Sequence, residues 1–211
     1  MDTEDLISKL AATPRAAPMD DRRMMALTFG AVVLPLALFL GTLGVRHGLG
    51  LALSNPIVVV KTVLPLVIFA LALPELPRLT RPEGTHETKL YRLALPILAA
   101  LALFVLTLFN PEALASRLEG GLMGVVECVG LISLLSIVPV WVGLRQLGQG
   151  AVTRPGFAGA LAGFVAGSGT AAGYSLFCTR DNPLFYLVWY SVAIGLATLA
   201  GSLLGRRMLR W

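Results

Sequence analysis

Two cysteines, Cys128 and Cys178, are the only thiols in this chain of 211 residues. They are 50 residues apart, but both lie at predicted helix ends that face the same side of a membrane. Two thiols on the outer side of a bacterial membrane are in an oxidising compartment, where they form a disulfide or a redox-sensitive dithiol. The alternative is that both are small apolar residues that only pack. We expect Cys178, which begins a polar turn, to be the more exposed thiol.

The first residues of the chain have the pattern of a short amphipathic helix. Thr3 is a suitable N-cap, and the acidic Glu4 and Asp5 favour the positive end of the helix dipole. Pro14 predicts the end of this helix. The apolar stripe consists of Leu6, Ile7, Leu10 and Ala11.

A helix of about ten residues is marginal when it is alone in water, so this stripe needs a surface that buries it. One interpretation is a tail that lies on the membrane or on the rest of the protein. However, residues 1–21 contain five acidic residues and only two basic ones, Lys9 and Arg15, so the tail is negatively charged. Anionic lipid would repel this negative charge, whereas a basic partner would attract it. We therefore favour a docking helix for a cytoplasmic partner. Its predicted contact residues are Thr3, Glu4, Asp5, Leu6, Ile7 and Leu10.

Lys61 is the only charged residue inside a predicted span, and Glu127 lies at the edge of another. A single charge is costly inside a bilayer, and the two residues are at similar depth, so they could pair. The alternative is that the Lys61 side chain extends to the membrane interface.

The elements that must position these groups are six hydrophobic segments of 17 to 22 residues. At about 1.5 Å per residue each can cross a hydrocarbon core of about 30 Å. The segments are 24–45, 57–73, 93–109, 128–144, 156–177 and 184–205. Hydrophobic residues make up 56% of the chain and charged residues only 14%. This composition excludes a soluble globular protein and predicts an all-α, polytopic, six-helix transmembrane bundle with short loops.

The distribution of basic residues predicts the orientation of this bundle. Thirteen Lys and Arg residues lie on the side of the N-terminus, and three lie on the other side. The three are Arg46, Arg117 and Arg180. By the positive-inside rule both termini are cytoplasmic, so the net charge of +5 reports topology rather than a nucleic-acid surface. The expected parts are a cytoplasmic tail at 1–23, the bundle at 24–205 and a basic C-terminus at 206–211. Between spans, 74–92 is typical of a solvated loop, and the loop 110–127, which ends in 122–127, is expected to lie along the membrane interface.

Glycines with a spacing of four characterise the fifth span and the end of the sixth. The first group is Gly159, Gly163, Gly167, Gly169 and Gly173, and the second is Gly201 and Gly205. Small residues at this period let helices approach closely, which predicts packing between the two spans. A contact between two copies of the chain is the alternative.

Prolines occur within the first four spans, at Pro35, Pro65, Pro96 and Pro139. Broken helices can mark transport sites, so a small-molecule permease or an accessory membrane subunit is the alternative function. We find no nucleophile–base pair, metal-ligand cluster or phosphate loop in the sequence. We therefore expect neither an enzyme nor a bound cofactor or metal.

The sequence resembles the NrsF family of bacterial membrane anti-sigma factors over essentially its whole length. The resemblance rests on the Thr-Glu-Asp-Leu-Ile-x-x-Leu-Ala start at Thr3, on the six spans and on the ending Leu-Leu-Gly-Arg-Arg-Met-Leu-Arg-Trp at Trp211. Its most specific part is the segment Cys178-x-x-x-x-Pro183-x-Phe185-x-x-x-Trp189-Tyr190.

This resemblance implies an inner-membrane protein whose cytoplasmic face holds an extracytoplasmic-function sigma factor inactive. It also implies that the sigma factor is released when the envelope meets oxidants or heavy metals. The paired cysteines of the family match Cys128 and Cys178. Arg180 departs from the pattern, because an acidic residue is expected there more often, and this weakens direct capture of a metal cation at the turn.

Overall fold

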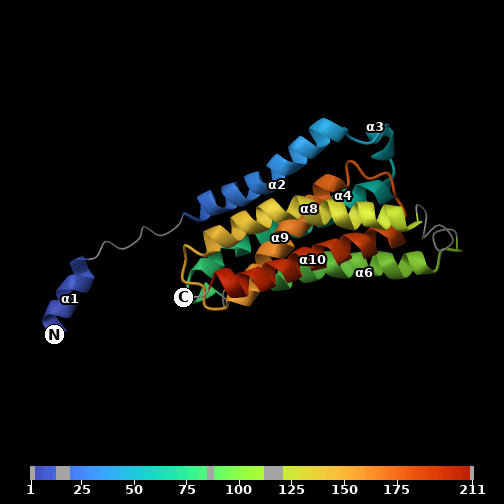
Figure 1. The fold of residues 1–211 in the computed structure, drawn as a ribbon. Helices are drawn as coiled ribbons and strands as arrows, with labels where there is room; N and C mark the ends of the chain where they lie inside the picture. Colours follow the sequence, from blue (N-terminus) through green and yellow to red (C-terminus); the bar gives the residue numbers. More distant parts are fainter. Residues whose placement is uncertain (1–2, 13–19, 85–87, 112–120, 210–211) are drawn as a thin grey trace.

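A computed structural model describes residues 3–12, 20–84, 88–111 and 121–209, and every regular element in these residues is helical (Figure 1). The α-helices are α1 (Thr3–Ala12), α2 (Asp21–Leu43), α3 (Leu49–Ala52), α4 (Pro56–Ala72), α6 (Ala94–Leu108), α8 (Gly121–Leu147), α9 (Pro155–Tyr174) and α10 (Pro183–Met208). Three short 3₁₀ helices are η1 (Leu73–Glu75), η2 (Pro77–Thr80) and η3 (Leu90–Leu93).

The long helices lie side by side in one bundle, and α1 stands clear of it (Figure 1). Helix α9 is at the centre and contacts α2, α4, α8 and α10, whereas α6 lies at the side against α4 and α10. We call the end where α2 begins and α10 ends the tail end. The opposite end, where Cys128 and Cys178 lie, is the thiol end.

Five helical segments are long and apolar enough to cross a membrane: Asp21–Leu43, Pro56–Thr80, Leu90–Leu108, Gly121–Leu147 and Pro183–Met208. Each turns much of its apolar surface outward; Leu34 and Leu95, for example, are largely exposed. Helix α9 is the sixth long helix, and it is rich in glycine, alanine, serine and threonine. Fourteen of its 20 residues are buried by the surrounding helices. Its role as a sixth span remains a prediction.

The glycines of α9 and α10 allow these two helices to pack with their backbones in contact. A methyl group at Gly159 would meet the carbonyl of Gly201, and one at Gly163 would meet the carbonyl of Ala197. At Gly205 it would lie 2.9 Å from the α-carbon of Gly159. The predicted packing of these two segments on each other is therefore confirmed.

Two expectations about the segments between helices are wrong. Residues 74–80 are not a solvated loop, because they fold as η1 and η2 with Leu76 and Leu79 fully buried. Glu75 is buried with them, where its carboxylate accepts hydrogen bonds from Arg78 and from the backbone of Lys89. The last part of the segment 110–127 is not a loop, since residues 121–127 are the first turns of α8, whereas residues 112–120 lie outside the described residues. Helices α8 and α10 begin earlier and end later than the segments that hydropathy predicts.

The close contact of α9 and α10 predicts an effect of side-chain size at Gly163. In Gly163→Val the added carbons meet backbone atoms of α10, so we expect the protein to lose about 1–3 kcal/mol of stability. Thermal unfolding of the purified protein in detergent measures the effect. Gly195→Val is the matched control on α10, because the space around that glycine is open. Equal melting temperatures for the two variants would contradict the prediction.

Candidate functional site at the thiol end

Cys128 and Cys178 meet inside the thiol end of the bundle. Cys128 lies on α8, and Cys178 follows α9 in the turn that leads to α10. The chain makes one further turn beyond α9, so the Cys178 N–H donates to the Tyr174 carbonyl at 3.1 Å. The Cys128 thiol donates a hydrogen bond to the Cys178 sulfur, and both residues are free thiols. The structure thus brings together the two thiols that the sequence singled out.

Both thiols are buried, at 1% exposure for Cys128 and 4% for Cys178. They belong to a core cluster with the aromatic residues Phe39, Tyr174 and Tyr190. Cys178 is the more exposed of the two thiols, as expected, but the polar turn does not open it to solvent. The physical reason is that the carbonyls of this turn point at buried cations instead of water.

The first of these cations is Lys61 of α4, whose side chain is fully buried. Its ammonium donates to the carbonyls of Cys178 at 2.7 Å and Arg180 at 2.8 Å, and it lies 3.3 Å from the Asp181 carboxylate. The three N–H groups of the ammonium thus have three acceptors, so this buried charge is paired. The expectation that Lys61 pairs with Glu127 is therefore wrong.

The second cation is Arg46, three residues beyond the end of α2. Its guanidinium donates to the Asp181 carboxylate at 2.7 Å and to the Cys178 carbonyl at 3.3 Å. Its backbone N–H also donates to the Leu176 carbonyl at 3.1 Å. Asp181 thus joins the end of α2 to Lys61 of α4.

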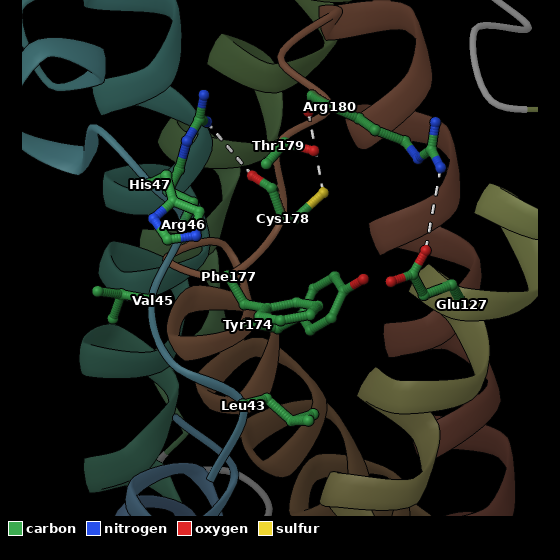
Figure 2. Close-up of a pocket in the computed structure, with 10 residues that line it drawn as sticks. All are labelled: Leu43, Val45, Arg46, His47, Glu127, Tyr174, Phe177, Cys178, Thr179 and Arg180. Atoms are coloured by element: carbon green, nitrogen blue, oxygen red, sulfur yellow. Dashed lines mark hydrogen bonds and ion pairs between the residues drawn. The ribbon is translucent and has the colours of Figure 1, made fainter. Parts of the chain in front are cut away.

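Glu127 faces Arg180 rather than Lys61. The carboxylate and guanidinium are 3.9 Å apart, and both side chains are partly exposed (Figure 2). A pair of this kind contributes little stability in water. The sequence indicates that Lys61 is unusual but does not indicate its partner. Asp181 lies beside Lys61 only because of the way the backbone turns after α9.

A cavity of about 300 Å³ adjoins Cys178 (Figure 2). Its lining combines polar groups of Arg46, His47 and Arg180 with the ring of Tyr174 and the Cys178 residue itself. Within the described residues no three His, Cys, Asp or Glu side chains are grouped to hold a metal ion. The chemistry of this site is that of two thiols beside a small polar cavity.

The surroundings of Cys178 favour its thiolate form. The hydrogen bond from Cys128 lowers the pKa of Cys178, burial raises it, and the nearby Lys61 ammonium lowers it again, so the pKa is below the ordinary thiol value. For Asp181, burial opposes ionisation, but hydrogen bonds from Arg46 and Lys61 outweigh it and lower its pKa. A thiolate is the reactive form of cysteine toward oxidants and electrophiles.

The second predicted site, on α1, is described only in part. Thr3, Glu4, Asp5 and Ile7 are exposed, and Ile7 is 54% exposed although it is aliphatic. The side chains of Leu6 and Leu10 lie outside the described set. The structure forms the predicted helix and leaves Ile7 uncovered.

The fold and these sites define a class: an all-helical protein with several helices able to cross a membrane, a buried thiol pair at one end and a separate amphipathic helix attached to the other. Residues 6–211 match the family described as NrsF, negative regulator of sigma F, and the chain belongs to this family.

Two relatives align with the whole chain over their whole length. The chain is 38% identical to the probable anti-sigma-F factor NrsF of Azospira oryzae. It is 30% identical to the anti-sigma-F factor NrsF of Caulobacter vibrioides. No solved structure shows significant similarity to it. The family is one of regulators rather than enzymes.

The lowered pKa of Cys178 predicts the pH dependence of its alkylation. Reaction requires the thiolate, which a thiol of lowered pKa retains as the pH falls. In the protein with both cysteines, an uncharged maleimide should modify Cys178, identified by peptide mass, at lower pH than it modifies a model thiol peptide. Replacing Lys61 by Met in the same background should move this profile upward. Mass spectrometry of the modified protein measures it, and coincident profiles with and without Lys61 would contradict the assignment.

Proposed function

We propose that this protein is a membrane-bound anti-sigma factor that holds an extracytoplasmic-function sigma factor at the inner membrane and releases it under envelope oxidant or heavy-metal stress. The observation that carries the proposal is the family match over residues 6–211, to a family described as negative regulator of sigma F. Five segments able to cross a membrane support the membrane location.

The tail end is the cytoplasmic end in this proposal, in agreement with the excess of basic residues on that side. Helix α1 is the docking element, and its acidic first turn suits a basic surface on the sigma factor. Burial of Leu6, Ile7 and Leu10 supplies the apolar part of the contact, very roughly 1.5–3 kcal/mol for each side chain before ordering costs.

The thiol end is the sensing end, on the envelope side. Oxidation of Cys128 and Cys178 by hydrogen peroxide would form one S–S bond, and the two electrons and two thiol protons would pass to the peroxide, which becomes two water molecules. The thiolate of Cys178 would be the attacking group, since its surroundings favour that form. Because the pair lies in a packed core, a bonded pair or an adduct requires its neighbours to move.

The docking role predicts a loss of binding when the apolar stripe is changed. Replacing Leu6, Ile7 and Leu10 together by Asp should abolish co-purification of the sigma factor, since the stripe then cannot be buried. Membrane fractions should contain the variant at the normal level, because α1 stands clear of the bundle. Ser8→Ala, an exposed position on the same helix, is the control. Normal repression by the triple variant would remove the tail from the mechanism.

The sensing role predicts a separate effect for the cysteines. Replacing Cys128 and Cys178 by Ser should keep basal repression, since serine has the same side-chain shape and its hydroxyls can hydrogen-bond to each other, but should blunt induction by peroxide. A sigma-dependent reporter in cells gives the measurement. Full induction in the double variant would leave the cysteines as packing residues. That result would not affect the docking role, which depends on other residues.

A further inference from the structure

The turn that carries Cys178 is held by its backbone rather than by its thiol. Lys61 donates to the carbonyls of residues 178 and 180, and Arg46 donates to the carbonyl of residue 178. The Asp181 carboxylate accepts from both cations. None of these bonds uses the Cys178 side chain, so the contacts persist when the thiol is replaced. We call Lys61, Arg46 and Asp181 the clasp.

The clasp shares a residue with the thiol pair. The carbonyl of Cys178 is bound by both cations, while the sulfur of the same residue meets Cys128 in the packed core. An added group on this sulfur has little room, because the residue is 4% exposed. Moving the sulfur therefore moves the acceptor that both cations bind.

Arg46 connects the clasp to α2, which is packed on one side only. Its buried residues form a single stripe, in which Val32 lies over Gly169 of α9 and Leu36 lies over Gly173. Leu34 and Leu38 on the opposite face are about 70% exposed. The polar contacts of α2 with the rest of the protein are the clasp at the thiol end, the hydrogen bond from Gln146 of α8 to Thr28, and the pair of Asp21 with Arg81 at the tail end.

The polar contacts at the two ends of α2 differ in strength. The pair of Asp21 with Arg81 is about half exposed on both sides, and exposed pairs contribute little. Arg46 is 11% exposed and has two side-chain bonds and one backbone bond to the Leu176–Asp181 segment. The position of α2 along the bundle therefore depends mainly on the stripe and the clasp.

We infer that the clasp is a positioning device that couples the thiol site to α2, the helix to which the tail is attached. While Cys178 is unmodified, Lys61 and Arg46 hold its turn and fix α2 against α9. When the thiol site is modified, the turn moves, Arg46 loses its acceptors and α2 is loosened together with the tail. That this movement releases a sigma factor rests on the proposed function. The coupling between the thiol site and α2 is tested separately.

The variant that tests the coupling is Arg46→Gln. It removes the charge and shortens the side chain but keeps it polar, so Asp181 is left with Lys61 alone. The matched control is Glu127→Gln, which removes a charged partner of the same turn on the α8 side, since Glu127 pairs with Arg180 rather than with a clasp residue. Asp181→Ala is a second test variant, with its side chain 29% exposed and hence less costly to truncate. Size-exclusion chromatography selects the folded variants.

The readout is crosslinking between α2 and α8 in membranes. In the tail-end half of the bundle, the Gln146 amide donates to the Thr28 hydroxyl at 3.2 Å. Thr28→Cys and Gln146→Cys, placed in the Cys128→Ser, Cys178→Ser background, can be joined by a short bis-thiol reagent. We expect Arg46→Gln and Asp181→Ala to slow this crosslink about fivefold, which corresponds to roughly 1 kcal/mol. Glu127→Gln should leave its rate unchanged.

Equal crosslinking rates in the clasp variants and the control would overturn the inference. The same clasp variants are then made with both native cysteines, and co-purification measures how much sigma factor each variant retains. A slower crosslink with partial release of unstressed sigma factor supports both the clasp and the proposed function. A slower crosslink with a normally retained sigma factor supports the clasp and contradicts its proposed role in release.

Discussion

The thiol end of this protein depends on one buried positive charge. Lys61 is fully enclosed, and an ammonium without partners at that position would be very costly. The turn after α9 supplies those partners by aiming two carbonyls and a carboxylate at it. That arrangement turns Cys178 inward against Cys128 and brings Asp181 within reach of Arg46. The contacts of α2, α4, α8 and α9 at this end therefore depend on the protein groups that pair with this one buried cation.

Two kinds of helix packing coexist around α9. Its contact with α10 is made by backbone against backbone, at glycines that tolerate no side chain. Its contact with α2 is made by aliphatic side chains of α2 that lie over glycines of α9. This contact is smoother, and it covers only one face of α2. Small interface residues give close contact in both cases, but only the first interlocks the two backbones. The bundle thus has a rigid pair at its centre and a less constrained helix at its edge.

The sequence predicted the helical class, the packing of the glycine-rich segments and the meeting of the two cysteines, because each depends on hydropathy or spacing. It predicted the wrong partner for Lys61, since depth in a span restricts the candidates but a five-residue turn decides among them. It also missed the burial of Leu76 and Leu79, where Pro74 and Pro77 suggested a solvated loop. Those prolines instead begin 3₁₀ turns that continue the line of α4. The local composition indicated that the α-helix ends here. It did not indicate whether the chain that follows is buried or exposed.

The burial of Cys178 has a kinetic consequence. A reagent meets this thiol only through a cavity of about 300 Å³ or while the surrounding turn is open. The rate of modification is then the intrinsic reactivity of the thiolate multiplied by the fraction of time during which it is reachable. Small uncharged oxidants reach such a site more readily than bulky thiols do, so in the proposed sensing role its oxidation and its reduction would face different steric limits. A brief pulse of oxidant would leave most copies unmodified, whereas sustained exposure would accumulate modified protein, and the site would therefore act as an integrator of exposure over time.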